Sequence, residues 1–178
     1  MITNEKLLQL KDRQMLQSGD VLSCSGTSWL ARAIKKMTKS RINHTALVLE
    51  IWGELFIMDS QKDGTNPRRF EEWTEKYKYE YRVHRPMSFS KEQKKKAISK
   101  SGTTPYDFSS LLWYQPRYLL TGKWKGKKGT KAEDRMYCSE YVSWVFNFED
   151  WWANSPQRVL EILESSDDFK EINFDYED

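Results

Sequence analysis

Two short segments of the sequence carry the residue types that a thiol nucleophile and its base require. Cys138 is the second residue of the largely apolar segment 137–142. His44 lies far upstream, at the start of another apolar run. A cysteine becomes a useful nucleophile when its thiolate is populated, which the positive end of a helix or a nearby imidazolium favours. The pair therefore suggests nucleophilic catalysis, in the unusual order of histidine before cysteine.

Each of these residues also has a simpler interpretation. A free cysteine packs as a small hydrophobic side chain, so Cys138 alone is more often buried and inert. A histidine at the start of a buried strand, like His44, is more often a hydrogen-bonded core residue than a base. The other histidine, His84, precedes Arg85-Pro86 at a predicted strand end, and we expect it to be structural or exposed.

A predicted β-hairpin supplies a third candidate for the site. Residues 44–51 are apolar and β-branched, residues 52–54 predict a turn, and residues 55–60 return as the partner strand. If the loop has an even number of residues, His44 and Asp59 share one face within side-chain reach. Asp59 could then accept the proton on the far imidazole nitrogen, as the third residue of a triad does. The alternative is a carboxylate that merely ends a strand.

The elements around this hairpin are predicted from apolar periodicity, capping residues and turn signals. Asn66-Pro67 should end the hairpin region. We expect helices at 4–17, 29–37, 68–77, 91–102 and 157–163, a helix starting near Cys138, and strands at 21–24, 79–84 and 169–174.

Length and composition indicate a single domain, residues 1–178, with a soluble globular composition and a core that needs no staple. The net charge of +3 is too mild to demand a nucleic-acid partner. No segment predicts a membrane span or a secretory signal. Cys24 and Cys138 fit a reducing compartment better than a disulfide, so we expect a cytoplasmic protein or a viral protein delivered by other means.

Metal and nucleotide sites are not predicted, and we expect no cofactor. The two histidines and two cysteines lack CxxC or HxxxH spacing. The Gly/Lys loop 122–129 lacks the order and the strand-before-helix context of a phosphate-binding loop. Its lysines could touch phosphates or lipid headgroups, although such a loop is more often a mobile surface flap.

Five motifs in this order resemble the circularly permuted NlpC-type papain-like cysteine hydrolases, the YiiX/YebB-like group. They are Gly19-Asp20-Val21-Leu22, Asn43-His44-Thr45-Ala46-Leu47-Val48, Asp59, Tyr106-Asp107 and Tyr137-Cys138-Ser139-Glu140-Tyr141-Val142. The resemblance extends over most of the chain. A permutation would explain why the histidine precedes the cysteine.

The resemblance implies an α+β papain-like domain whose antiparallel central sheet is packed on one side by the Cys138 helix. It implies a cysteine hydrolase of the amidase or peptidase kind, with Cys138 as nucleophile, His44 as general base and acid, and Asp59 as orienting group. The family usually has glutamate at the third position, which is one methylene longer. Relatives act on cell-wall peptides or are suspected of acting on acylated lipids, and the Cys138 backbone amide would help to hold the oxyanion.

Three other functions remain open at this stage. The same thioester chemistry would serve an acyltransferase or lipid hydrolase. A non-catalytic module could bind a peptide or lipid, with peripheral membrane contact through the basic loop. Nucleic-acid binding ranks lowest. Four aromatic residues could line a cleft for an apolar substrate, although so many are mainly core: Trp29, Trp113, Tyr114 and Trp124.

Overall fold

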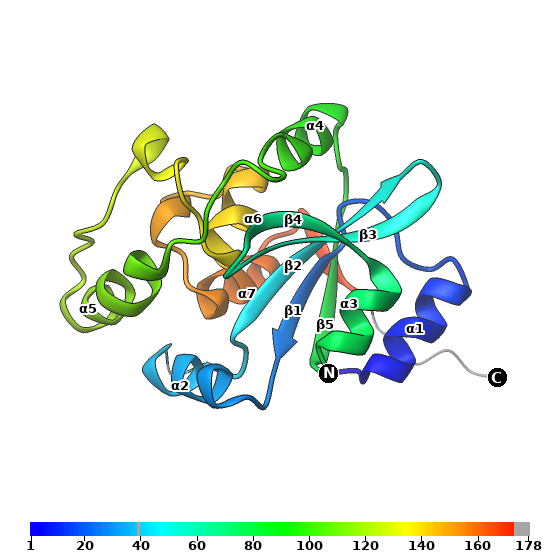
Figure 1. The fold of residues 1–178 in the computed structure, drawn as a ribbon, viewed down its shortest axis with the longest axis horizontal. Coiled ribbons are helices and arrows are strands. Elements are labelled where there is room, and N and C mark those ends of the chain that lie inside the picture. The colour runs from blue at the N-terminus through cyan, green and yellow to red at the C-terminus, as the bar shows by residue number, and fades with distance from the viewer. Residues whose placement is uncertain (39, 173–178) are drawn as a thin grey trace.

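A computed structural model describes residues 1–38 and 40–172, without the side chains of residues 30, 37 and 38. Within these residues one antiparallel sheet has the strand order β4-β3-β2-β1-β5-β6 (Figure 1). The strands are β1 (Val21–Ser25), β2 (His44–Ile51), β3 (Glu54–Gln61), β4 (Gly64–Arg69), β5 (Glu80–Pro86) and β6 (Phe169–Glu171).

Helices lie on both faces of the sheet. They are α1 (Asn4–Asp12), α2 (Trp29–Thr38), α3 (Phe70–Lys76), α4 (Lys91–Ser99), α5 (Gln115–Thr121), α6 (Cys138–Phe146) and α7 (Pro156–Ser165). A π-helical segment, Ser110–Tyr114, leads into α5, and short 3-10 helices cover Gly129–Ala132 and Trp151–Ala153. The predicted α+β class with an antiparallel sheet packed against helices is confirmed. None of the helices in the described ranges is long and apolar enough to cross a bilayer.

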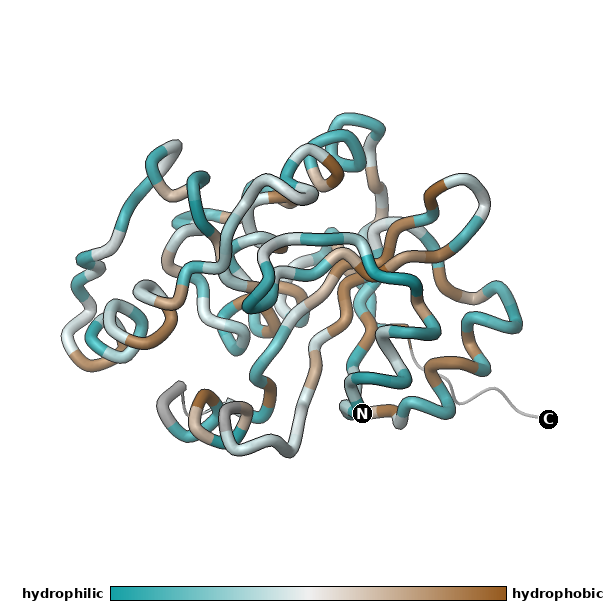
Figure 2. The backbone as a smooth tube through the Cα atoms, viewed as in Figure 1, coloured by the Kyte–Doolittle hydropathy of each residue, from teal (hydrophilic) through white to brown (hydrophobic). Residues whose placement is uncertain are grey.

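Alternating side chains of the central strands build two apolar layers, one on each face of the sheet. One layer joins Leu22, Ala46, Val48 and Ile57 to side chains of α1 and α3. The other joins Val21, Leu47, Leu49 and Met58 to side chains of α6 and α7. Figure 2 shows the central strands as largely brown, hydrophobic segments. The helix that begins with Cys138 therefore packs against one face of the sheet, as predicted.

The β2–β3 hairpin has the register that the sequence predicts. Leu47 pairs with Met58 and Ile51 pairs with Glu54, so even positions of β2 face odd positions of β3. Trp52 and Gly53 form the two-residue loop with φ of 53° and 80°, as a type I′ turn requires. This parity puts His44 and Asp59 on the same face of the sheet.

The expectation that Asn66-Pro67 ends the hairpin region is wrong. Residues 64–69 form the edge strand β4, in which Pro67 pairs with Met58 and Asn66 pairs with Asp59. Proline cannot donate a ladder hydrogen bond, but an edge strand tolerates it where its nitrogen side faces away from the sheet. The added strand places Arg68 beside Asp59.

The first helix is shorter than predicted, since α1 ends at Asp12 instead of near residue 17. Gln14 has a left-handed φ of 55°, and Arg85 Nη2 donates to the Met15 carbonyl at 2.5 Å. The left-handed residue turns the chain out of the helix, and the contact with Arg85 holds the segment that follows. At the other end, strand β6 begins at residue 169 as predicted, and residues 173–174 lie outside the described residues.

The Gly19-Asp20 pair has a local structural reason. Gly19 has a left-handed φ of 99°, and a Cβ there would lie 2.7 Å from the Phe89 ring. Both the backbone conformation and the lack of space therefore exclude a side chain at this position. Asp20 is buried and accepts two hydrogen bonds from Arg85, both at 2.8 Å. The pair therefore anchors the entry into β1 to strand β5.

Candidate functional site

The candidate nucleophile occupies the first position of α6. Tyr137 is its N-cap residue in extended conformation, and the Glu140 carboxylate accepts a hydrogen bond from the Tyr137 amide at 3.0 Å. The first amides of a helix have no partner within the helix, so the Cys138 thiol lies at its positive end. Helix α6 packs on β2, the strand that His44 begins.

His44 and Asp59 meet across the hairpin. His44 Nε2 lies 3.3 Å from Asp59 Oδ2, and both side chains are buried. Cys138 lies close enough to the same imidazole for each group to shift the pKa of the other. Since Nε2 faces the carboxylate, Nδ1 is the ring nitrogen left for the sulfur. The structure therefore brings together all three residues that the sequence selects.

Asp59 is fixed by donors from three further side chains. Trp73 Nε1 and Gln61 Nε2 each donate to Oδ2 at 2.6 Å, and Arg68 Nε donates to Oδ1 at 2.8 Å. Burial raises the pKa of Asp59, but the hydrogen bond and charge of His44 and the bonds from Arg68 and Gln61 outweigh it and lower the pKa. The carboxylate is therefore charged and held in one orientation.

The pKa values of His44 and Cys138 shift in opposite directions. Burial lowers the pKa of His44, but the Cys138 thiolate and the bond to Asp59 raise it to about 10. Burial raises the pKa of Cys138, but the His44 charge and hydrogen bond, with backbone amides of Thr45 and Ser139, lower it overall. A thiolate paired with an imidazolium is thus the favoured state.

Two tyrosines enclose this pair. The rings of Tyr79 and His44 stack with their centroids 6.0 Å apart. Tyr106 packs against a buried cluster that contains Cys138 and Tyr137. Burial, and then the charge of Cys138, raise the pKa of the Tyr106 phenol well above its usual value. Tyr106 therefore stays protonated and can donate a hydrogen bond.

The sulfur is nearly covered in this conformation. Cys138 is 2% exposed and His44 is 7% exposed. Tyr106, which is partly exposed, also lines a cavity of about 370 Å³ that Gly64 and Thr104 border from the other side. A substrate carbonyl can reach the sulfur only if such covering side chains move.

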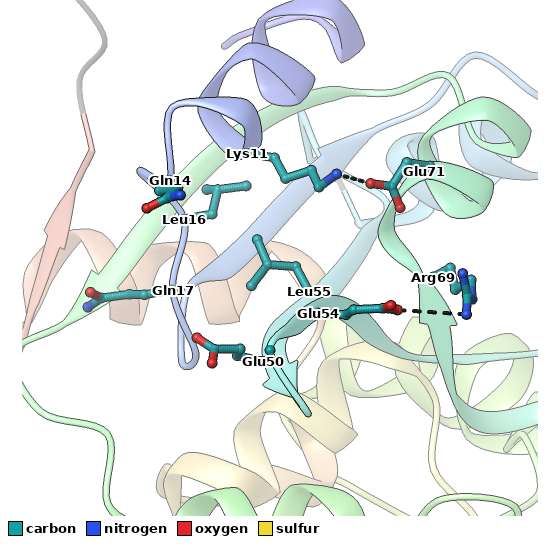
Figure 3. A pocket seen from close by; sticks show the side chains of 10 residues that line it. Lys11, Gln14, Leu16, Gln17, Glu50, Glu54, Leu55, Arg69 and Glu71 are labelled. Atoms are coloured by element: carbon teal, nitrogen blue, oxygen red, sulfur yellow. Dashed lines mark hydrogen bonds and ion pairs between the residues drawn. The ribbon is translucent and has the colours of Figure 1, made fainter.

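A larger pocket of about 780 Å³ lies elsewhere, between the end of α1 and the β2–β3 hairpin (Figure 3). It contains no histidine or cysteine among its lining residues. Four of its five charged side chains pair with one another, Lys11 with Glu71 and Arg69 with Glu54. The volume of a pocket is therefore a poor guide here, because the candidate catalytic residues lie outside this larger pocket.

The remaining candidates from the sequence have different surroundings. Cys24 and Cys138 are both free thiols, and Cys24 is completely buried. His84 is neither exposed nor at a strand end but buried within β5, where burial lowers its pKa to about 4. Trp29 and Trp113 are each 75% exposed, so neither side chain is enclosed in a cleft.

A metal does not fit this site. Among the described residues, no three His, Cys, Asp or Glu side chains are grouped so that they could hold an ion. The oxygens of Asp59 already accept bonds from nitrogen donors, including the Arg68 guanidinium. The groups available for chemistry at this site are therefore protein side chains and backbone amides.

Residue-by-residue reasoning missed the groups that support the triad. Arg68 and Trp73 lie on β4 and at the buried face of α3, and Gln61 ends β3. The indole of Trp73 could have been suspected, because a buried Trp requires a partner for its N–H. Nothing in the local pattern distinguishes Arg68 or Gln61 from surface residues.

Comparisons with known proteins give a likeness in fold. No family model and no curated protein matches the chain. Among solved structures, the chain resembles a protein of Escherichia coli O157:H7 described as metalloprotein yiiX, DUF1105. The TM-score is 0.51 at 19% identity, over 88% of this chain and 96% of that chain. At this identity the likeness establishes a shared fold alone, which is consistent with the resemblance to the YiiX-like group.

Proposed function

We propose that this chain is a cysteine hydrolase of the amidase or peptidase kind with a permuted papain-like fold. Cys138 is the nucleophile, His44 the general base and acid, and Asp59 the residue that orients the imidazole. The observation that carries the proposal is one buried imidazole that contacts the carboxylate and lies close enough to the thiol for each to shift the pKa of the other. A merely structural histidine would not need a thiolate on one side and a fixed carboxylate on the other.

Attack begins from the thiolate. His44 holds the proton that the thiol has lost, and the sulfur attacks the carbonyl carbon of an amide or ester. The negative charge then moves to the carbonyl oxygen. Amides in the first turn of α6 lie close by, although the Ser139 amide already donates to the sulfur, which leaves the Cys138 amide as the first oxyanion donor.

Tyr106 is our candidate for the second oxyanion donor. Its phenol remains protonated across the working pH range, and the ring packs on the cluster that contains Cys138. If the substrate carbonyl lies between the start of α6 and the cavity that Tyr106 lines, the Tyr106 hydroxyl would face the carbonyl oxygen. Tyr106→Phe keeps the ring and removes only the donor, so it should reduce kcat more than it raises KM.

Collapse of the tetrahedral intermediate completes acylation. His44 gives its proton to the leaving amine, the carbon–nitrogen bond breaks, and a thioester to Cys138 remains. Water then attacks the thioester while His44 takes one of its protons, and the acid and the free thiol are released. Asp59 keeps Nε2 protonated and turned away from the sulfur throughout both steps.

Acylation by a small activated ester tests this proposal whatever the natural substrate is. Wild type, Cys138→Ala and Cys24→Ala are incubated with p-nitrophenyl acetate, and the intact masses are measured after rapid acid quenching. We expect an acetyl adduct on wild type and on Cys24→Ala, mapped to Cys138, and none on Cys138→Ala. Equal labelling of all three proteins would reject the assignment.

A further inference from the structure

One segment of the chain concentrates positive charge. Residues 108–132 contain six basic and no acidic side chains: Arg117, Lys123, Lys125, Lys127, Lys128 and Lys131. The remainder of the chain, with 23 basic and 26 acidic residues, is net negative. The segment therefore supplies more than the whole net charge of +3. Such segregation on one stretch of surface favours an anionic partner.

The same segment exposes large apolar side chains. Leu120 is 86% exposed and Trp113 is 75% exposed, while Phe108, Leu112 and Leu119 are each exposed by 41% to 47%. These five account for half of the ten exposed large hydrophobic residues in the described part of the chain. Single exposed leucines are ordinary, but a cluster on one helical segment marks an interaction site.

Charged and apolar groups meet at a pocket beside this segment. A cavity of about 460 Å³ is lined by three basic side chains and one acidic one, together with Ser110 and Tyr114; the charged residues are Lys125, Lys127, Arg135 and Asp107. Lys127 pairs with the exposed Asp134 at 3.2 Å, and such a surface pair contributes little. The Asp107 carboxylate accepts hydrogen bonds from the Ser110 hydroxyl and amide, and the three basic side chains leave the recess net positive, of a kind that accepts a phosphate-bearing headgroup.

The segment occupies one end of the molecule. Figure 1 shows α5 and the loop that follows it at the opposite side from α1 and the chain termini. Figure 2 shows brown stretches of α5 at this outer edge. Helix α2, which contacts α5, begins with Trp29, and that side chain is 75% exposed. The apolar and basic groups can therefore meet a flat surface together.

We propose that residues 108–131, with Trp29, form a docking surface for a lipid bilayer that contains anionic lipids. Leucine and tryptophan side chains enter the headgroup region, and the lysines contact the acidic headgroups, as in interfacial helices. A nucleic acid would use the lysines and Trp113 but has no use for Leu119 and Leu120. A second copy of this chain would bring two basic surfaces together, which charge repulsion opposes.

Docking would also orient the candidate active site. Leu111 faces inward and shares a buried cluster with Cys138, while its neighbours Leu112 and Trp113 face outward. Tyr137, the residue before the nucleophile, donates from its hydroxyl to Gln115 at 3.1 Å. The layer between the bilayer and the thiol is therefore a single helical segment. This surface goes beyond the proposed hydrolase and does not depend on turnover.

Vesicle co-sedimentation of the Cys138→Ala protein tests the proposal separately from catalysis. We expect at least about ten-fold stronger binding to phosphatidylcholine vesicles that contain phosphatidylserine than to phosphatidylcholine alone. Leu119→Glu/Leu120→Glu and Lys125→Glu/Lys128→Glu should each weaken binding by about ten-fold or more. All four positions are exposed, and thermal unfolding verifies that the variants remain folded.

Matched controls come from the opposite parts of the molecule. Trp52 is 96% exposed at the hairpin tip, and Lys91 and Lys95 are exposed on α4. Trp52→Ala and Lys91→Glu/Lys95→Glu should leave vesicle binding unchanged, although the second variant has the same net charge as the loop variant. Equal losses in these controls would overturn the proposal.

Two further outcomes would assign the surface to another partner and overturn the proposal. One is preferential binding to single-stranded oligonucleotides that is lost in Lys125→Glu/Lys128→Glu but retained in Leu119→Glu/Leu120→Glu. The other is self-association in sedimentation velocity, without vesicle binding, that disappears in the leucine variant.

Discussion

The two cysteines of this chain have the same side chain and opposite chemical environments. Cys24 lies within β1, directly opposite His44 in the strand ladder, and its thiol donates to the Leu22 carbonyl at 3.5 Å. Burial raises the pKa of Cys24 well above 9.0. Cys138 is equally buried, yet its pKa is lowered because a charged imidazole and two amides stabilise the thiolate.

This difference indicates that neither burial nor a neighbouring histidine in the strand ladder is sufficient to lower the pKa of a thiol. Cys24 pairs with His44 in the ladder between β1 and β2, but its thiol donates a hydrogen bond to a carbonyl. This bond stabilises the protonated form of the thiol. Cys138 lies far along the chain, but α6 presents its sulfur to donors only. The direction from which hydrogen bonds reach the sulfur separates an inert thiol from a candidate nucleophile.

The largest expected effect comes from deleting each thiol in turn. Cys138→Ala should lower turnover of any amide or ester substrate by about 10³-fold or more, because the covalent step is lost. Cys24→Ala should change turnover by less than about threefold and destabilise the fold by about 1 kcal/mol. Steady-state assays with thermal unfolding measure both. A larger catalytic loss in Cys24→Ala would reverse the assignment.

The next effect concerns the carboxylate that orients the imidazole. Asp59→Asn keeps the shape but removes the charge, so kcat should fall by about 10²-fold or more as the favoured tautomer is lost. Asp63→Asn is the matched control, because Asp63 also pairs with Arg68, at 2.6 Å, but is exposed. Equal kinetic losses would show that Arg68 matters instead of the contact with His44.

The pH dependence of acylation should reflect both members of the ion pair. The rate should rise as the pH passes the Cys138 pKa, which lies below 9.0, because the thiolate forms. It should fall as the pH rises through about 10, where His44 loses the proton needed by the leaving amine. Rates measured with an unactivated amide should show both limbs, and a profile that rises monotonically beyond pH 10 would contradict this assignment.

The smallest effect should come from the groups that hold Asp59. Trp73→Phe removes the Nε1 donor but keeps an aromatic ring, so we expect about 1 kcal/mol of destabilisation. The catalytic loss should be below about ten-fold, since Gln61 and Arg68 still hold the carboxylate. Denaturant unfolding and kcat of the same preparation measure both quantities. A loss as large as that of Asp59→Asn would make the indole the main orienting group.

Much of the site could be predicted because it depends on local rules. The alternation of β2 and the two-residue turn at Trp52-Gly53 are sufficient to place His44 and Asp59 on one face. The apolar run after Cys138 likewise predicts a helix that begins at the thiol. Both inferences use spacing within one element or between adjacent strands.

The rest depends on contacts between distant segments. Strand β4 contains a proline, and only its position at the sheet edge makes that acceptable. Helix α1 ends at Asp12, and the segment beyond it is held by Arg85, which donates to the Met15 carbonyl. The bonds of Trp73 and Arg68 to Asp59 likewise follow from the tertiary arrangement, which no local pattern in one sequence specifies.

The most direct test of the account is pH-dependent alkylation of the two thiols, resolved by mass spectrometry. A small reagent such as iodoacetamide is applied to wild type and His44→Ala. In wild type, Cys138 should be labelled at least about ten-fold faster than Cys24 near neutral pH. In His44→Ala the pKa of Cys138 should rise, so its labelling should slow toward that of Cys24. Equal, slow labelling of both cysteines in wild type would contradict the thiolate–imidazolium pair and with it the proposed nucleophile.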